Sequence, residues 1–297
     1  MSNEPMISSD RHGRTFIDHV LSRQGSVIAV TAVAAAVSVM GGAVLTIAGN
    51  LPYEPVAGTS LIGSFFSVTT PFTLAAAATA VAVTVESSPV RVGLLFTAAF
   101  VIAGAISPAA GLPAVLGVST GGSLSLFGAV SDDLNADTYR QLLLVGAAIL
   151  GIALSLGRTV GLAPGGSHTV GVGATLLAIA LLGLELPVDR PSLLVGIIAA
   201  LGLVGAGTSA PFATGATLLV GFGITNIPVV GVAIAVAGVV AALASGLRDR
   251  AVLPVAGCGL CLFSGVSTTP ESAAGLVIGF TIILCRDSIA TPRGEFA

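Results

Sequence analysis

The sequence predicts an all-α integral membrane protein, a polytopic bundle of about ten transmembrane helices (range 8–10) with both termini in the cytoplasm. Three observations lead to this class: the composition, the spacing of the apolar runs and the positions of the arginines. Of 297 residues, 54% are hydrophobic and only 8% are charged, whereas a soluble domain carries roughly a quarter charged residues. Such a chain cannot cover a water-facing surface, so lipid must solvate most of its side chains.

The apolar runs divide the chain into candidate spans. A membrane helix needs about 20 apolar residues, and runs of this kind follow one another through most of the sequence. The predicted spans are 26–48, 61–85, 92–118, 141–157, 169–186, 192–209, 211–225, 227–246, 252–268 and 271–286.

Three regions follow from these spans. Residues 1–25 are predicted to form a cytoplasmic tail, 26–286 the transmembrane bundle and 287–297 a second cytoplasmic tail. Between Arg14 and Arg23 the apolar side chains fall on one helical face, which suits a short amphipathic helix on the membrane surface. A plain polar tail is the alternative interpretation.

Arginines set the predicted orientation. All eleven basic residues are arginines, and cytoplasmic loops should carry the excess of such residues. Ten spans leave only Arg140 and Arg190 on the side opposite the termini. An extra span at 112–130 would reverse the side of everything after it, so we expect 108–138 to be partly a re-entrant or outer loop. The predicted location is the cell membrane, crossed several times.

Three stretches place Ser or Thr shortly before a proline, in "FSVTTPF", "GTSAPFA" and "GVSTTPES". Proline suits the first turn of a helix, and a preceding Ser or Thr can cap it. Pro71 instead lies about ten residues inside its span, where it is predicted to kink or unwind the helix. Residues considered for a substrate pathway or a helix break are Ser67, Thr69, Thr70, Pro71, Ser209, Pro211, Asn226, Thr268, Thr269 and Pro270.

These breaks allow two interpretations. Unwound, hydroxyl-rich points can mark the substrate site of a transporter, whereas simple punctuation between helices carries no function. No ionisable residue falls in the middle of a predicted span, which argues against a proton relay or a charged substrate. The functional hypothesis is a permease or channel-like protein for a small neutral solute. The alternative is a non-catalytic membrane subunit or scaffold of a larger complex.

Signals of catalysis are weak. Asp133 and Asp137 have the D-x-x-x-D spacing that resembles the magnesium–diphosphate motifs of membrane prenyltransferases, but the other parts of those motifs are missing. Cys258 and Cys261 lie in an apolar run without a further ligand nearby, and a metal site needs three or four ligands. We therefore predict no enzyme activity, no catalytic or metal-binding residue and no cofactor.

Two G-x-x-x-G sequences, at 117–121 and 275–279, bear on partners. This spacing lets two membrane helices approach closely. It favours tight packing inside the bundle, with a homo- or hetero-oligomer through Gly/Ala-rich faces as the other interpretation. The expected partners are membrane lipids, and the lack of a basic patch argues against nucleic acid.

Overall fold

A computed structural model of the protein describes residues 10–49, 59–130, 136–164, 166–207, 229–265 and 269–290, and this part of the chain contains helices and no strands. The helices are α1 (Asp10–Gly49), α2 (Thr59–Thr84), α3 (Ser88–Ile106), the short 3-10 helix η1 (Pro108–Ala110), α4 (Gly111–Gly128), α5 (Ala136–Thr159), α6 (Ser167–Glu185), α7 (Arg190–Gly207), α9 (Val229–Arg248), α10 (Val252–Ser264), α11 (Pro270–Leu284) and α12 (Arg286–Ala290).

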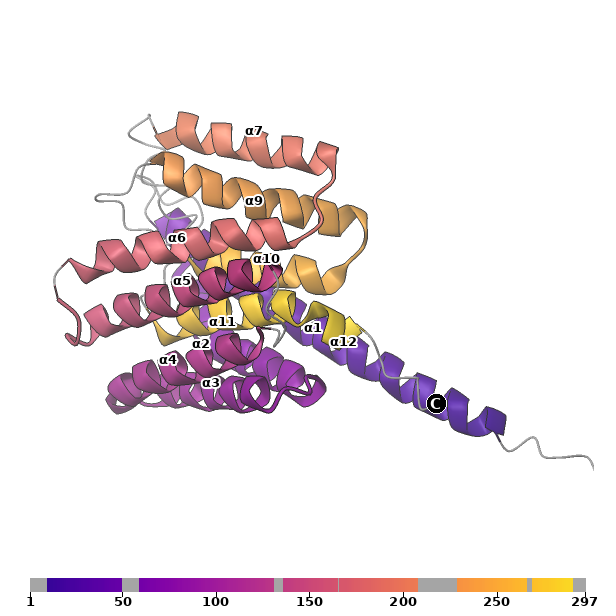
Figure 1. Ribbon diagram of the computed structural model, residues 1–297. Helices are drawn as coiled ribbons and strands as arrows, with labels where there is room; N and C mark the ends of the chain where they lie inside the picture. Colours follow the sequence, from indigo (N-terminus) through magenta and orange to yellow (C-terminus); the bar gives the residue numbers. More distant parts are fainter. Residues whose placement is uncertain are drawn as a thin grey trace, which may run out of the picture.

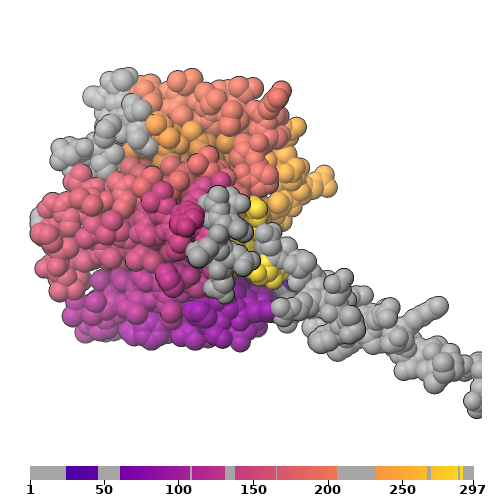
Figure 2. All heavy atoms as spheres, viewed as in Figure 1, coloured from indigo at the N-terminus to yellow at the C-terminus, as the bar shows by residue number. Residues whose placement is uncertain are grey.

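The helices form one bundle in which sequence neighbours pack side by side (Figure 1). On the face of the molecule in Figure 2 the colours change broadly from purple to orange, because most helices lie beside the next one in sequence. Helix α9 is an exception, because it lies between α6 and α7 (Figure 1). Helix α1 begins before the predicted tail ends, and its first turns extend away from the bundle in Figure 1.

Helix α11 lies at the centre of the bundle. It contacts α1, α2, α3, α4, α5 and α10, and every residue from Ala273 to Ile283 is buried. A helix that is apolar all round lies in a protein core or in a membrane, and here other helices surround it. Gly275 and Gly279 lie against Ser264 and Cys261 of α10. The G-x-x-x-G sequence of α11, at 275–279, therefore serves packing inside the bundle.

Five helical stretches of the described residues are long and apolar enough to cross a membrane. They are Gly25–Leu45, Leu61–Thr84, Ser88–Ile106, Thr138–Thr159 and Ser167–Glu185. By contrast, α10 has 13 residues and α11 has 15, which corresponds to about 20 and 22 Å, less than the hydrocarbon thickness of about 30 Å.

The predicted span 92–118 is wrong, because two helices share this stretch. Helix α3 ends at Ile106, η1 makes a turn, and α4 runs back along α3 from Gly111. Proline at 108 cannot donate a backbone hydrogen bond and keeps Ser107 extended, with φ −134° and ψ 118°. The expectation of a loop over 108–138 is therefore wrong for residues 111–128, and the continuous apolar run concealed the turn.

Because α3 and α4 are separate helices, the helix ends that lie together differ from those predicted with a single span at 92–118. Ser87, before α3, donates a hydrogen bond to Gly128 at the end of α4 (3.1 Å). Arg140 near the start of α5 and Arg286 after α11 both reach Glu185 at the end of α6. These contacts define one end of the bundle, which we call the arginine end.

The arginines gather at this end. Nine of the ten arginines in the described residues lie there, on the first part of α1 or at the adjoining ends of other helices, and Arg158 lies at the opposite end. Arg140 and Arg190, predicted to face away from the other arginines, therefore lie with them. The error follows directly from treating α3 and α4 as one span.

Candidate functional site

The residues considered from sequence do not come together in one place. Ser209, Pro211, Asn226 and Thr268 lie outside the described residues. The remaining six separate into two groups, one inside α2 and the other at the start of α11. The similar sequences around Pro71 and Pro270 therefore have different structural roles.

Thr269 and Pro270 start a helix. The Thr269 hydroxyl accepts a hydrogen bond from the Ser272 backbone N–H (3.2 Å), and the Ser272 hydroxyl accepts one from the Thr269 N–H (3.1 Å). This reciprocal arrangement is a capping box, with proline at the first helical position where its missing N–H costs nothing. The interpretation of this stretch as helix punctuation is confirmed.

Pro71 lies inside α2, which continues through it as a helix and does not unwind. The hydroxyls of Ser67 and Thr69 donate to the carbonyls of Ser64 and Phe65, both at 2.9 Å. A proline removes one intrahelical hydrogen bond, and the turns on either side of it remain bonded.

A small hydroxyl cluster joins α2 to α1 beside this proline. The Ser38 hydroxyl lies 2.9 Å from the hydroxyl of Thr70 and 3.5 Å from that of Thr69. Ser38 is 5% exposed. Thr70 is 14 residues before the end of α2 at Thr84, or about 21 Å from the arginine end. The cluster therefore lies near the middle of the bundle along the helix axis, with Ser38 buried and both threonines half-buried. Sequence reasoning missed Ser38 because it is a single Ser in a long apolar run.

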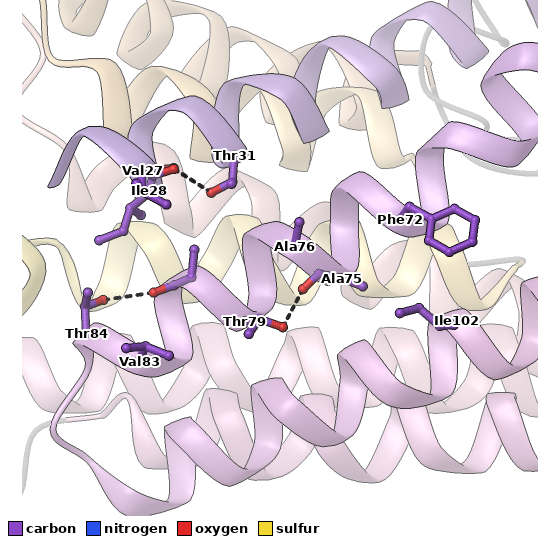
Figure 3. Close-up of a pocket in the computed structure, with 11 residues that line it drawn as sticks. Val27, Ile28, Thr31, Phe72, Ala75, Ala76, Thr79, Val83, Thr84 and Ile102 are labelled. Atoms are coloured by element: carbon purple, nitrogen blue, oxygen red, sulfur yellow. Dashed lines mark hydrogen bonds between the residues drawn. The ribbon is translucent and has the colours of Figure 1, made fainter. Parts of the chain in front are cut away.

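A groove of about 710 Å³ opens between α1 and α2 on the arginine-end side of this cluster (Figure 3). Its lining is apolar except for three threonines. Each threonine donates its hydroxyl proton to a carbonyl of its own helix, at 2.8–2.9 Å. The lining residues are Val27, Ile28, Thr31, Phe72, Ala75, Ala76, Thr79, Ala80, Val83, Thr84 and Ile102.

Elsewhere in the described part of the bundle, every buried polar residue is a serine or a threonine. The hydroxyls of Ser125 and Thr281 lie 3.0 Å apart between α4 and α11. The buried hydroxyls of Ser155 and Ser264 have no hydrogen-bond partner in this part, and both side chains pack against a glycine of a neighbouring helix. The interior formed by the described residues therefore offers hydroxyls and no charge.

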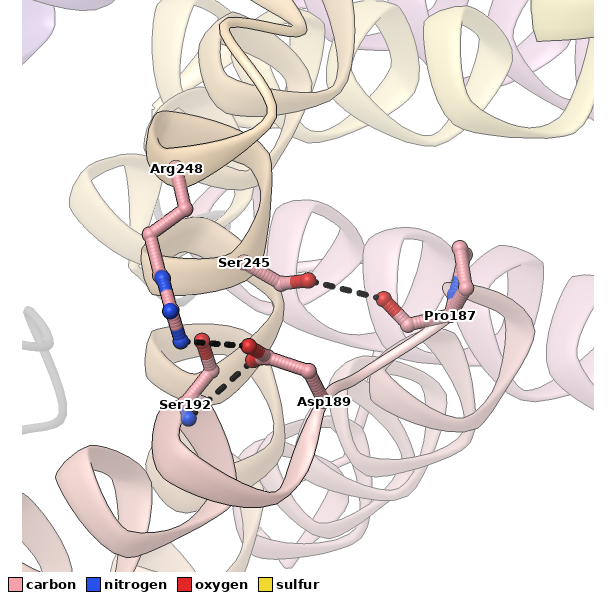
Figure 4. Close-up of polar contacts among 5 residues, drawn as sticks. All are labelled: Pro187, Asp189, Ser192, Ser245 and Arg248. Atoms are coloured by element: carbon pink, nitrogen blue, oxygen red, sulfur yellow. Dashed lines mark hydrogen bonds and ion pairs between the residues drawn. The ribbon is translucent and has the colours of Figure 1, made fainter.

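Charged groups meet at the arginine end instead (Figure 4). The Arg248 guanidinium donates to the Asp189 carboxylate at 2.5 Å, and the Ser192 N–H donates to the same carboxylate at 3.1 Å. Hydrogen bonding from Ser192 lowers the pKa of the Asp189 carboxyl, and Arg248 acts in the same direction. The contacts fasten α7 to α9, and the Ser245 hydroxyl joins α9 to the Pro187 carbonyl (3.1 Å).

The cysteines and aspartates considered from sequence for metal binding do not form a metal site in the described residues. Cys258 and Cys261 are buried, and Cys261 lies against Gly279. The described residues contain no group of three His, Cys, Asp or Glu side chains that could hold a metal ion. Asp132 and Asp133 lie outside the described residues, between α4 and α5. That connection leaves α4 at the arginine end, not at the opposite end as predicted.

These features define an integral membrane protein whose described helical interior is uncharged. A model of an integral membrane family of unknown function (DUF8068) matches residues 28–284. The chain belongs to this family, and the match covers nearly all of the bundle. No curated protein matches the chain. No solved structure matches it either.

Proposed function

We propose that this protein crosses the cell membrane ten times, with the arginine end in the cytoplasm, and acts as a permease or channel-like protein for a small neutral solute. The proposed crossings are α1 to α7 and α9 to α11, while the predicted span 211–225 lies outside the described residues. Helices α10 and α11 are shorter than the hydrocarbon layer, and we include them because each is packed among longer helices that shield its ends from lipid. The asymmetry of the arginines supports this orientation, since cytoplasmic loops carry the excess of Arg and Lys.

Labelling with a membrane-impermeant maleimide tests the orientation. The three native cysteines are buried, so an added cysteine should dominate the signal. Leu162→Cys, in the exposed turn after α5, should react in intact cells. Asp249→Cys, exposed after α9, should react only after the cells are permeabilised. The reverse pattern would contradict the proposed orientation.

The observation that carries the solute hypothesis is the cluster of Ser38, Thr69 and Thr70. It joins α1 and α2 about halfway along the bundle, whose described buried polar residues are all Ser or Thr. Hydroxyls can exchange hydrogen bonds with a neutral solute, while a charged solute would need a counter-charge. The proposal includes no catalytic step.

Solute-driven swelling of proteoliposomes tests this hypothesis. A panel of small neutral solutes should enter faster with the wild-type protein than in protein-free vesicles. Ser38→Ala and Thr70→Val should slow entry several-fold. The matched control is Thr175→Val in α6, where a buried threonine bonds its own helix at Gly171 (3.0 Å). Entry at the protein-free rate for the whole panel would overturn the solute hypothesis.

The second candidate function is a non-catalytic subunit or scaffold, and helix α7 favours it. Ser192 and Gly196 are buried in α7, and Gly196 lies against α9, while Leu194, Ile198 and Leu201 are each more than half exposed. Such a face can contact lipid or another membrane protein. Recovery of the protein from native membranes with a stoichiometric partner would support this function, and recovery only as a single chain would weaken it.

A further inference from the structure

The groove between α1 and α2 has the depth of one lipid leaflet. Along α2 its lining extends from Thr84 to Phe72, which is 12 residues or about 18 Å. One leaflet contributes about 15 Å of hydrocarbon. The groove begins at the arginine end and stops before the hydroxyl cluster, so it matches an acyl chain that enters from that leaflet.

Chemistry of the lining suits an acyl chain as well. Alanine, valine, isoleucine and phenylalanine supply most of the surface, and the three threonine hydroxyls donate to carbonyls of their own helices. A polar ligand would gain little from these walls. Val27 and Val83 at the rim are 55% and 65% exposed, so the groove is open toward the lipid and a chain can enter it sideways.

An arginine of α3, Arg91, binds the backbone beside Val83 and Thr84, the lining residues of α2 at the arginine end. The Arg91 guanidinium donates to the carbonyls of Ala82 (3.2 Å) and Val85 (3.0 Å), at the end of α2. The side chain is exposed, and these two contacts use two of its five donors. Arg23 lies one turn before Val27 on α1, and Glu86 follows α2. Arginine is well suited to phosphate because its planar donors match phosphate oxygens.

We propose that the groove binds one acyl chain of an anionic phospholipid, with the lipid phosphate at Arg91. The inference goes beyond the proposed solute function and does not depend on it. Basic residues between membrane helices recognise anionic headgroups, while the groove adds a specific place for the chain. The bound lipid would fill the space where α1 and α2 are not in contact.

The absence of tryptophan from the sequence allows a direct test. Val83→Trp places a single fluorophore on the exposed rim of the groove. The protein is reconstituted in vesicles of phosphatidylcholine containing phosphatidylglycerol, with bromine on the acyl chains of one lipid or the other. Bromine quenches tryptophan on contact, so the two series give the relative association of each lipid. We expect phosphatidylglycerol to be preferred about fivefold at low salt.

A second tryptophan variant distinguishes lipid binding in the groove from a general attraction of anionic lipid to any nearby arginine. Leu194→Trp lies on α7, four residues after Arg190, with 59% of its native side chain exposed and away from the residues that line the groove. We expect no such preference there. Equal association of the two lipids at Val83→Trp, or an equal preference at both reporters, would overturn the proposal.

Substitutions of Arg91 in the Val83→Trp protein test the headgroup contact. Arg91→Gln should abolish the preference, and Arg91→Lys should retain most of it because the charge remains. Loss of the preference in both variants would assign the effect to the carbonyl contacts that Arg91 makes with α2, and would overturn the phosphate site. Retention in both variants would overturn it as well.

Discussion

Two helix pairs of this bundle are built from similar small residues and pack in opposite ways. Between α3 and α4 the backbones touch: a Cβ atom added at Gly93 would lie 2.5 Å from both the Gly121 oxygen and the Ser125 nitrogen. Between α1 and α2 the helices meet at Ser38 and Thr70 and leave a groove of about 710 Å³ beyond them (Figure 3). Small residues permit close packing, but they do not by themselves produce it.

The position of the glycines explains the difference. Gly117 and Gly121 are one turn apart on α4, and both face α3, where Gly121 meets Gly93 and Gly117 receives the Phe100 ring. The groove face of α2 instead carries Ala76, Thr79 and Ala80, each of which has a Cβ atom. Membrane helices gain little from burial alone, since lipid is equally apolar, so close contact depends on shape.

The largest expected effect comes from adding one methyl group to the α3–α4 contact. Gly93→Ala should destabilise the protein by about 3 kcal/mol, because the new atom meets the backbone of α4 and cannot be accommodated by a side-chain movement. Thermal unfolding of the purified protein in detergent measures the change.

Gly146→Ala in α5 is the matched control for this prediction. A Cβ atom there meets nothing within 4 Å, and alanine favours the helix by about 0.5–1 kcal/mol relative to glycine. We expect unchanged or slightly raised stability. If Gly93→Ala behaved like Gly146→Ala, the direct backbone contact of α3 with α4 would be incorrect.

A smaller effect is expected for the hydroxyl contact of α1 with α2. Ser38→Ala, Thr70→Val and the double variant form a thermodynamic cycle across the 2.9 Å contact. Interhelical hydrogen bonds of this kind in membranes average about 0.6 kcal/mol. Reversible unfolding in mixed micelles measures the coupling energy. A coupling energy of zero would show that the two hydroxyls do not interact.

The smallest effect is expected inside the groove. Ala76→Leu adds three carbon atoms to an exposed position of its lining, where no backbone opposes them. The free energy of unfolding should change by less than about 0.5 kcal/mol. A loss comparable to that of Gly93→Ala, measured in the same detergent, would mean that α1 closes over the groove and that the two helix pairs do not differ.

Local sequence predicted the start of α11 and the main feature of the interior. Thr269, Pro270 and Ser272 form a cap from residues adjacent in sequence, so local chemistry is sufficient to predict it. The sequence has few charged residues in its apolar runs, and in the described structure the buried polar residues are accordingly all Ser or Thr. Pro71 shows the limit, because neighbouring turns kept α2 helical where proline alone predicted a break.

Composition alone determined that this is a helical membrane protein, because a chain with 8% charged residues cannot present a surface to water. Only the tertiary structure decided that α3 and α4 are two helices, that Ser38 lies against Thr70, and that Arg140 and Arg190 lie at the same end as most other arginines. Hydrophobicity shows how much of the chain prefers lipid, but it does not locate a turn between two apolar helices such as α3 and α4. Which helices meet depends on contacts between residues distant in sequence.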